Sequence, residues 1–206
     1  TVPEPGETEC FDGWAEYLQG LRVAMDTNAL RHGLQSLGLK VIVDPMHGSA
    51  AGGLPALLGE AVSEIRSQRD PLFGGHPPEP LAPYLSELIA QVKASTAAGQ
   101  PAVGIVFDGD GDRLGVVDNE GNEIFSDKIG LMLAEYLSEK YSGSKFVIDV
   151  KSTGLFFNNE ILKKNNCTVD MWKTGHSHMK RRVKEINALC GFEKSGHFFI
   201  GKPLGL

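Results

Sequence analysis

Short apolar runs alternate along this chain with longer segments of helical periodicity, and this alternation limits the fold more than any other feature. Residues 40–44, 102–107 and 145–149 are rich in β-branched residues and predict strands. Residues 102–107 are continuously apolar, which suits a central strand covered on both faces. Strands separated by helices predict an α/β fold, and the alternation occurs twice, with a boundary near residue 124.

Helices are expected wherever apolar residues recur every three to four positions. The pattern predicts helices at residues 9–25, 50–59, 81–98, 127–141, 155–164 and 179–187, with another helical stretch punctuated by Gly33 and Gly38. Asp127 is the expected N-cap of the helix that follows it. Further strands are expected at residues 114–118, 168–172 and 188–192. Residues 67–80 hold four prolines and two glycines and therefore predict a loop.

The predicted elements divide the chain into two units. Residues 1–124 form the first expected domain, and residues 1–6 read as the tail of a linker. Residues 125–206 form the second expected domain. Its pattern stops inside a predicted sheet, so we expect this second domain to be incomplete.

Composition excludes several classes of protein. The 206 residues carry 20 basic and 26 acidic side chains, a net charge of −6, without a block of like charges, which argues against a nucleic-acid partner. No apolar run approaches the roughly 18 residues of a membrane span, so no membrane partner is expected. Cys10, Cys167 and Cys190 form no CxxC pair and no disulfide framework, which favours the reducing cytoplasm.

An acidic loop between two predicted strands is the most informative stretch of the chain. Asp108, Asp110 and Asp112 alternate with glycines, and without a cation their carboxylates would repel one another. The glycines allow the backbone to fold tightly, so all three side chains can point to one centre. Hard oxygen ligands in this arrangement predict Mg²⁺ or Ca²⁺ rather than Zn²⁺.

An EF-hand and a solvated acidic turn are the two alternatives to a magnesium site in this loop. If Asp108 were the first position of an EF-hand, the sixth would be Arg113 instead of Gly and the twelfth Asn119 instead of Glu. That spacing excludes an EF-hand, and a solvated acidic turn without metal is the remaining alternative. Three carboxylates beside an arginine suggest a metal that bridges to a phosphate, which points to phosphoryl transfer.

Three motifs in order make essentially the whole chain resemble the α-D-phosphohexomutase family, typified by phosphoglucomutase and phosphomannomutase. They are DGDGDR at residues 108–113, GHS at residues 175–177 and EKSGH at residues 193–197. The resemblance implies two tandem α/β domains with mixed sheets, corresponding to the second and third of four domains around a central cleft. In such proteins the first domain carries a phosphoserine, and the fourth grips the substrate phosphate.

The resemblance assigns roles to the acidic loop. Asp108, Asp110 and Asp112 would hold Mg²⁺ against the phosphoserine. Arg113 would contact the substrate or the transferred phosphoryl group.

The resemblance also assigns roles in the second domain. Glu193 and Ser195 lie where the family hydrogen-bonds the sugar 3- and 4-hydroxyls, and His197 would contact the sugar or order the loop. A polar β-turn is the alternative for this segment. Lys151 would stabilise the migrating phosphoryl group or transfer a proton, unless it is a plain surface lysine. His176 would act as a general acid/base or contact phosphate at a helix N-terminus, unless it is structural.

The family's phosphoserine sequence, Thr-Ala-Ser-His-Asn-Pro, does not occur among these residues, and neither does a phosphate loop of the fourth domain. We therefore expect the 206 residues alone to be inactive and to need the remaining domains of a parent protein as partners. The expected activity interconverts hexose 1-phosphate and 6-phosphate through phosphoserine and a hexose 1,6-bisphosphate. Glucose and mannose phosphates are the leading substrates, and glucosamine phosphate is the runner-up. A non-catalytic, metal-dependent sugar-phosphate-binding module is the alternative.

Overall fold

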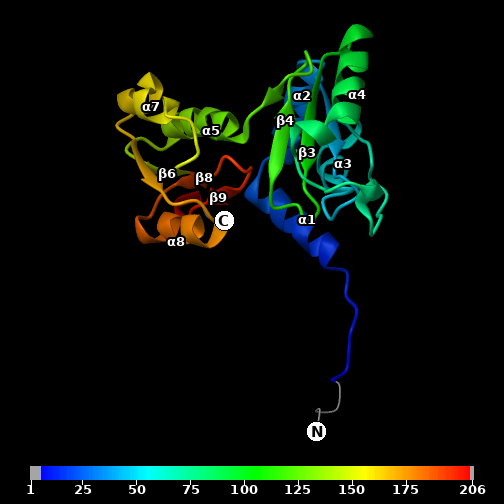
Figure 1. Cartoon of the computed structure of the whole chain (residues 1–206), viewed down its shortest axis with the longest axis horizontal. Coiled ribbons are helices and arrows are strands. Elements are labelled where there is room, and N and C mark those ends of the chain that lie inside the picture. Colours follow the sequence, from blue (N-terminus) through cyan, green and yellow to red (C-terminus); the bar gives the residue numbers. More distant parts are fainter. Residues whose placement is uncertain (1–5, 205–206) are drawn as a thin grey trace.

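The computed structural model describes residues 6–204 and contains two α/β units, one following the other in the sequence (Figure 1). Most of the predicted linker, residues 1–5, lies outside the described residues. Residues 6–12 form an exposed segment without secondary structure that leads away from both sheets (Figure 1). The prediction of an α/β fold with two mixed sheets is confirmed.

The first unit is built on a five-stranded sheet with the order β2-β1-β3-β4-β5. Its strands are β1 (Lys40–Asp44), β2 (Val62–Glu64), β3 (Ala102–Phe107), β4 (Leu114–Val117) and β5 (Glu123–Ile124). β1 is parallel to β2 and β3, whereas β4 is antiparallel to β3 and β5. Because parallel strands end at the same edge of a sheet, the acidic loop after β3 lies beside the turn after β1.

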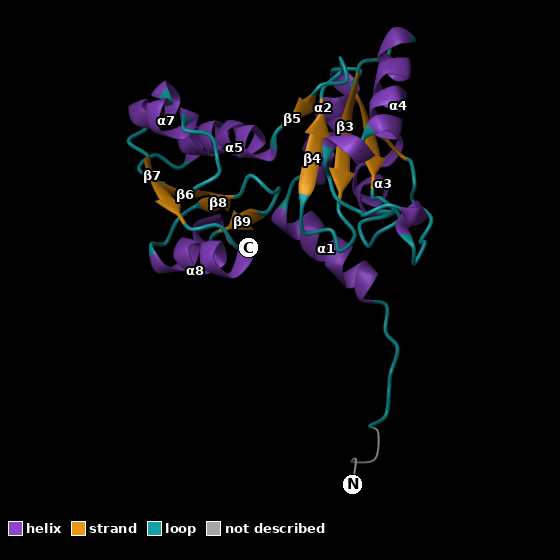
Figure 2. Ribbon diagram, viewed as in Figure 1, coloured by secondary structure: helices purple, strands orange, loops and turns teal. Residues whose placement is uncertain are grey.

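Helices cover both faces of the first sheet, as Figure 2 shows. They are α1 (Gly13–Ala24), α2 (Thr27–Ser36), α3 (Gly53–Leu58) and α4 (Ser86–Ala97), with 3₁₀ turns at Gly59–Ala61, Phe73–Gly75 and Ala82–Tyr84. Successive side chains of a strand point to opposite faces. In β1, Val41 and Val43 accordingly pack with α1, α2 and α3, whereas Ile42 packs with α4.

The second unit is built on a four-stranded sheet with the order β7-β6-β8-β9. Its strands are β6 (Lys145–Asp149), β7 (Thr168–Trp172), β8 (Cys190–Phe192) and β9 (Phe198–Ile200). β6 lies between β7 and β8 and is parallel to both, and β9 returns antiparallel to β8. The loops after β6, β7 and β8 therefore meet at one edge of this sheet.

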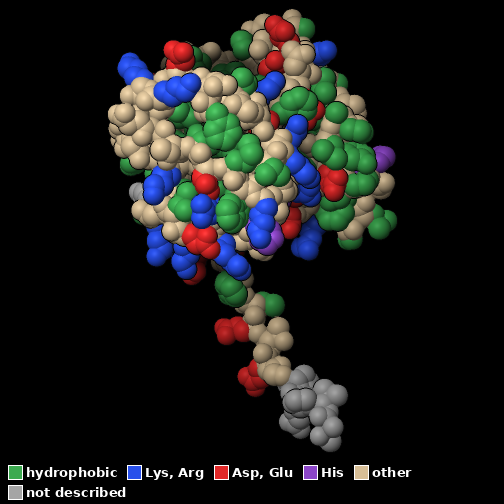
Figure 3. All heavy atoms as spheres, turned by 60° about the vertical axis from the view of Figure 1, so that its left-hand side comes forward, with side chains coloured by type: hydrophobic (Ala, Val, Ile, Leu, Met, Phe, Trp, Pro, Cys, Tyr) green, Lys and Arg blue, Asp and Glu red, His purple; other side chains and the backbone are tan. Residues whose placement is uncertain are grey.

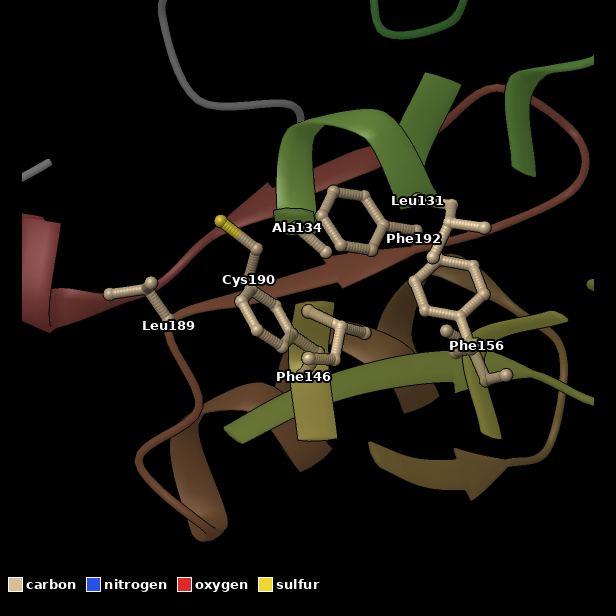
Figure 4. Packing of buried hydrophobic residues seen from close by; sticks show 9 residues of the cluster. Leu131, Ala134, Phe146, Phe156, Leu189, Cys190 and Phe192 are labelled. Carbon is tan, nitrogen blue, oxygen red and sulfur yellow. The ribbon is translucent and has the colours of Figure 1, made fainter. Parts of the chain in front are cut away.

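Two groups of helices sandwich the second sheet, with α5 and α7 on one side and α8 on the other (Figure 2). The helices are α5 (Ser126–Lys140), α6 (Leu155–Asn158), α7 (Glu160–Lys164) and α8 (His176–Glu185), followed by a 3₁₀ turn at Lys202–Leu204. Aromatic rings fill the core on the α5 side (Figure 4). The ring of Phe192 lies 6.2 Å from that of Phe146 and 5.9 Å from that of Phe156, centre to centre, which is a favourable stacking range.

Cys190 is buried in this core, and burial raises the pKa of its thiol to about 12, although the backbone N–H of Gly201 opposes the shift. An unfolded thiol ionises near pH 8.5, so the native state holds its proton more tightly than the unfolded state does. The contribution of the protonated Cys190 thiol to the free energy of unfolding is fully present below the pKa of the unfolded thiol. This contribution is lost as pH rises from about 8.5 toward 12. We expect it to disappear at about 1.4 kcal/mol per pH unit over that range.

Urea unfolding at pH 8, 9 and 10 checks this expectation. The free energy of unfolding should fall more steeply with pH in the unaltered protein than in Cys190→Ala. Cys10→Ala is the matched control, because Cys10 is exposed and its removal should leave the slope unchanged. Equal slopes in all three proteins would contradict the expectation.

The structure corrects the predicted start of α5. Asp127 is not the N-cap: the helix begins at Ser126, with Phe125 in the capping position, and Asp127 lies in the first turn. Its buried carboxylate instead accepts a hydrogen bond of 2.7 Å from the backbone N–H of Thr153. A long-range partner therefore takes the place of the local cap that the sequence suggested.

Other predicted helices have different boundaries. The helix predicted at residues 50–59 is limited to α3, because Gly52 before it is left-handed with φ of 82°. The one predicted at residues 155–164 is divided at Asn159, whose side chain accepts from the N–H of Leu162 and caps α7. The helix predicted at 179–187 begins earlier, at His176.

Several short elements were not predicted from the sequence. β2, β5 and β9 contain only two or three residues, too few for an apolar period to identify them. The helix predicted from residue 81 begins at Ser86, because a 3₁₀ turn precedes it. β2, β5 and β9 are each defined by hydrogen bonds to a neighbouring strand, which the sequence does not reveal.

Basic side chains gather along the lower part of the face in Figure 3, the level at which α8 lies in Figure 1. From the sequence, the basic residues of this helix are expected to form a solvated face; they are Lys180, Arg181, Arg182 and Lys184. Lys180, Arg181 and Lys184 are exposed, which agrees with that prediction. Arg182 is different: it is only partly exposed, pairs with Asp170 at 2.7 Å and stacks over the ring of Trp172 at 4.3 Å.

Candidate functional site

The acidic loop is the hairpin connection between β3 and β4. The last pair of the ladder joins Phe107 to Leu114, and the N–H of Asp108 then bonds to the carbonyl of Arg113 at 3.3 Å. The N–H of Gly111 bonds back to the carbonyl of Asp108 at 3.2 Å, with φ of 79° at Gly111. A left-handed residue at this point closes the loop, and glycine adopts that conformation without a steric penalty.

The loop brings the three predicted metal ligands together. One carboxylate oxygen from each of Asp108, Asp110 and Asp112 lies within 4.8 Å of the other two. Asp108 is buried, whereas Asp110 and Asp112 are exposed. Mg²⁺ binds oxygen ligands, carboxylates among them, at about 2.1 Å. The all-oxygen donor set therefore fits Mg²⁺.

The turn after β1 supports the acidic loop from one side. The N–H of Ser49 bonds to the carbonyl of Gly109 at 3.0 Å, and the N–H of Gly109 bonds to the carbonyl of Pro78 at 3.2 Å. A Cβ atom at Gly48 would lie 2.5 Å from the Gly109 carbonyl oxygen, and one at Gly109 would lie 2.8 Å from Cγ of Pro78. Glycines at these two positions let the turn after β1 and the loop that contains Pro78 pack closely against the acidic loop.

Arg113 is tied to the first carboxylate of the loop. Its Nε donates to Oδ2 of Asp108 at 2.6 Å, and its backbone N–H donates to Oδ1 at 3.0 Å. Partial burial by itself lowers the pKa of Arg113, but the hydrogen bond and charge of Asp108, with weaker contributions from Glu79 and Asp112, raise that pKa overall. The guanidinium is thus a fixed positive charge at the edge of the carboxylate cluster.

The second predicted loop, residues 193–197, is the hairpin connection between β8 and β9. The N–H of Glu193 bonds to the carbonyl of His197 at 3.0 Å, and the N–H of Gly196 bonds to the carbonyl of Glu193 at 3.1 Å. The Glu193 carboxylate is buried, and its Oε1 accepts the N–H of Gly175 at 2.6 Å. Its Oε2 lies 3.3 Å from Oγ of Ser195 and 2.8 Å from Nδ1 of His197.

The two hairpin loops, which the sequence separates widely, contact each other. Arg113 and His197 form an isolated antiparallel β-bridge, and the N–H of Leu114 bonds to the carbonyl of Gly196 at 3.1 Å. Nε2 of His197 lies 3.4 Å from Oδ1 of Asp112. The loop of the second domain is therefore held directly beside the acidic loop of the first.

His176 joins the same cluster from the start of α8. Its ring meets that of His197 edge-on, with centres 5.4 Å apart, and lies 5.2 Å from the ring of Phe199. The His176 side chain is also exposed to solvent, so it can contact a ligand that binds next to residues 193–197.

Lys151 is the one predicted site residue that this cluster does not include. It is exposed in the loop after β6, and within residues 6–204 its side chain forms no hydrogen bond or ion pair with the other predicted site residues. The structure thus brings together eight of the nine residues singled out from the sequence. They are Asp108, Asp110, Asp112, Arg113, His176, Glu193, Ser195 and His197.

Sequence reasoning missed two glycines that shape the site. Gly175 supplies the backbone donor for the Glu193 carboxylate, and its φ is 128°. Gly196 has φ of 103°, and a Cβ atom there would lie 2.8 Å from the carbonyl oxygen of Leu114. Both occur inside the motifs GHS and EKSGH, so the motifs marked their positions but not their structural purpose.

Comparison with protein families identifies both units. Residues 3–121 match phosphoglucomutase/phosphomannomutase, alpha/beta/alpha domain II, and residues 125–203 match domain III of the same family. The chain belongs to the phosphoglucomutase/phosphomannomutase family. These matches cover domains II and III in the order that the three motifs predicted.

Individual members of the family agree with this assignment. A phosphomannomutase/phosphoglucomutase of Pseudomonas putida is 37% identical over 166 residues, which are 79% of this chain and 35% of that protein. A family protein of Burkholderia thailandensis has 35% identity and a TM-score of 0.69, with 79% of this chain and 35% of that chain covered. A putative phosphomannomutase of Thermus thermophilus has 26% identity and a TM-score of 0.81, with 95% and 44% covered. The chain thus spans about a third of the length of the curated relative.

No helix among residues 6–204 has both the length and the apolar character needed to cross a membrane.

Proposed function

We propose that this chain supplies the metal loop and the sugar loop of a phosphohexomutase that interconverts hexose 1-phosphate and hexose 6-phosphate. The observation that carries the proposal is the contact between the two hairpin loops. The bridge between Arg113 and His197 sets the carboxylate cluster beside the polar side chains of residues 193–197. A phosphate at the first loop would therefore be next to a sugar ring at the second.

The acidic loop would prepare the site for phosphoryl transfer. Asp108, Asp110 and Asp112 would hold Mg²⁺, which when bound supplies positive charge to offset that of a phosphoryl group. Arg113 would direct its fixed charge to the same anion or to the substrate. A bidentate guanidinium suits this task, because two parallel N–H groups match two phosphate oxygens.

The second loop would orient the sugar. Ser195 is exposed and can donate to a sugar hydroxyl or accept from one, and His197 can contact the ring or hold the loop in place. Glu193 is buried, and both of its oxygens have protein partners in this structure. Contact between Glu193 and a sugar would therefore require the residues 193–197 to shift and to expose one carboxylate oxygen.

Two further residues would act on the phosphoryl group. His176, at the first position of α8, would donate or accept a proton or contact phosphate there. Lys151 projects from the loop after β6 into solvent and would approach the migrating phosphoryl group once substrate is bound.

The phosphoserine and the loop that grips the substrate phosphate would come from outside these 206 residues. The phosphoryl group would pass from that serine to a substrate hydroxyl and form a hexose 1,6-bisphosphate. After the bisphosphate turns around, its other phosphoryl group would return to the serine and release the isomeric monophosphate. Each half-reaction conserves one phosphoryl group, so no other phosphate donor is consumed.

Glucose and mannose phosphates are the proposed substrates, since the similar protein of Pseudomonas putida is named for both sugars. Glucosamine phosphate is the second candidate. The alternative class of function is a non-catalytic module that binds sugar phosphates with Mg²⁺ but takes part in no transfer.

An experiment on the chain and on the full-length protein separates these possibilities. Isothermal titration should show glucose 1-phosphate binding to the 206 residues in the presence of Mg²⁺, and a coupled assay should show no glucose 6-phosphate formed. The full-length protein, primed with glucose 1,6-bisphosphate, should form it. His197→Ala should weaken binding by about tenfold through loss of one or two hydrogen bonds, and His32→Ala is the control at a distant position.

Binding without turnover in the full-length protein would favour the non-catalytic module. An absence of binding in the unaltered chain, or equal binding in His197→Ala, would count against the assignment of residues 193–197 to the sugar.

A further inference from the structure

We infer that Asp149 is the residue that positions three loops of the second domain relative to one another, and with them the proposed substrate-contacting residues Lys151, His176 and Glu193. The inference rests on the proposed function for the roles of those three residues. Asp149 lies outside the three sequence motifs, and its carboxylate is buried.

Asp149 is the last residue of β6, the strand that lies between β7 and β8. All three strands are parallel, so their carboxyl ends meet at one edge of the sheet, where Asp149 pairs with Trp172 at the end of β7. The loops after β6, β7 and β8 thus start within reach of this side chain. In parallel sheets such an edge is where ligands usually bind.

The Asp149 carboxylate is bonded to each of these loops. Its Oδ1 accepts from Oγ of Ser152 at 2.5 Å, in the loop after β6. Its Oδ2 accepts from Oγ1 of Thr174 at 2.8 Å, in the loop after β7. The backbone N–H of Lys194, in the loop after β8, lies 3.3 Å from Oδ1.

Each partner of Asp149 is a near neighbour in sequence of a proposed functional residue. Ser152 follows Lys151, Thr174 is two residues before His176, and Lys194 follows Glu193. A bond to the neighbour leaves the functional side chain free, yet it fixes the backbone from which that side chain projects.

Burial makes this arrangement strong. Asp149 is 1% exposed, so solvent does not compete for its hydrogen bonds in this structure. A buried carboxylate without partners is costly, which keeps all three bonds in place together.

The loop that carries Lys151 is fastened a second time. The N–H of Thr153 donates to Oδ2 of Asp127 at 2.7 Å, and the Asp127 carboxylate is also buried. Lys151 therefore lies in a short segment whose following residues are bonded to two buried carboxylates. These two hydrogen bonds fix the backbone next to Lys151, although the lysine side chain itself is exposed.

Substitutions of Asp149 test the inference through amide chemical shifts in the ligand-free chain. Asp149→Ala removes all three acceptor contacts and should shift the amides of Lys151, His176 and Glu193 together. Asp149→Asn keeps an acceptor oxygen for Ser152 and the Lys194 N–H, and its NH₂ group, at the Oδ2 position, can donate to the Thr174 hydroxyl, so it should restore most of the native shifts. Leu162→Ala, a core truncation in the same domain, controls for loss of stability, since it also lowers the melting temperature but should leave the three loops unchanged.

Two single-bond variants extend the test. Thr174→Val should displace mainly the His176 loop, and Thr174→Ser should preserve it, because serine retains the hydroxyl. In Asp149→Ala the added Thr174→Val change should have almost no further effect, since the bond is already absent.

Binding of glucose 1-phosphate with Mg²⁺ provides the functional readout. Asp149→Ala should weaken it by at least about tenfold, and Asp149→Asn by about threefold or less. If the unaltered chain binds no glucose 1-phosphate, the proposed function fails while the ligand-free spectra still decide the positioning inference. Amide shifts confined to the Lys151 loop in Asp149→Ala would overturn the positioning inference. Equal amide shifts of the three loops in Leu162→Ala would also overturn it.

Discussion

Exchange of Asp110 for asparagine is expected to weaken the binding of a divalent cation to this chain by at least about tenfold. A bound cation would lose one unit of negative charge among its ligands, and at the usual metal–oxygen distance of about 2 Å even a water-like dielectric gives an attraction of several kcal/mol. Asp110 is exposed, and among residues 6–204 no hydrogen bond to its side chain is found, so the fold should not depend on it. Paramagnetic resonance of Mn²⁺ measures the free ion directly and gives the dissociation constant.

The control for this prediction is Glu120→Gln. Glu120 belongs to the turn between β4 and β5 and is also exposed, so this exchange changes the net charge equally without touching the acidic loop. Mn²⁺ affinity should be unchanged in the control. Equal affinity in Asp110→Asn and the unaltered chain would show that the three carboxylates do not form the ion site.

Replacement of Gly196 by alanine is expected to separate the two hairpin loops. The new Cβ atom would lie 2.8 Å from the carbonyl oxygen of Leu114, and φ of 103° is a conformation that alanine rarely adopts. Backbone strain of this kind costs roughly 1–3 kcal/mol, and the loops can relieve it by moving apart. The hydrogen bond from Leu114 N–H to Gly196 would then open, so exchange of the Leu114 amide proton should accelerate by at least about tenfold.

Gly143→Ala is the matched control for this second prediction. Gly143 also has a positive φ, 75°, but no atom lies within 4 Å of the position its Cβ would take. Gly143→Ala therefore introduces backbone strain of the same kind, but no steric contact between the two domains. It should lower the free energy of unfolding by about 1 kcal/mol and leave the Leu114 amide protected. If both variants expose that amide equally, the contact at Gly196 does not hold the loops together.

The two predictions address different parts of the proposed mechanism. Asp110 tests whether the acidic loop holds an ion, and Gly196 tests whether the second loop must lie beside it. If Asp110→Asn affects only the ion, and Gly196→Ala affects only the loop contact, the two loops are separate modules joined by docking. Loss of ion affinity in Gly196→Ala would instead show that His197, 3.4 Å from Asp112, helps to set the carboxylate geometry.

Features set by neighbours in the sequence could be predicted from the residues. The strands at residues 40–44, 102–107 and 145–149 agree with the structure, because a buried strand needs a short run of apolar side chains whatever its partners are. The convergence of Asp108, Asp110 and Asp112 also depends on local geometry, since alternate glycines within one hairpin suffice to bring them together.

Features set by distant partners could not be predicted in this way. Asp127 was expected to cap a helix, but its carboxylate bonds instead to Thr153, which only the packing of α5 against the second sheet brings near. Arg182 was expected in solvent, but it pairs with Asp170 because α8 lies against β7. In both cases the neighbouring sequence favours the position that was predicted for the side chain. A hydrogen bond to a partner farther along the chain is more favourable than that local arrangement.

The order of the longer strands and helices, the position of the acidic loop and the residue types at the site could thus be inferred from the residues alone, because each depends on side chains close together in the chain. The backbone bridge between Arg113 and His197, and the position of Asp149 among three loops, became apparent only from the folded chain. For Asp149 the cause is the parallel sheet, which brings the carboxyl ends of strands from distant parts of the chain to one edge. For Arg113 and His197 it is the contact between two hairpins of different sheets, which no sequence spacing specifies.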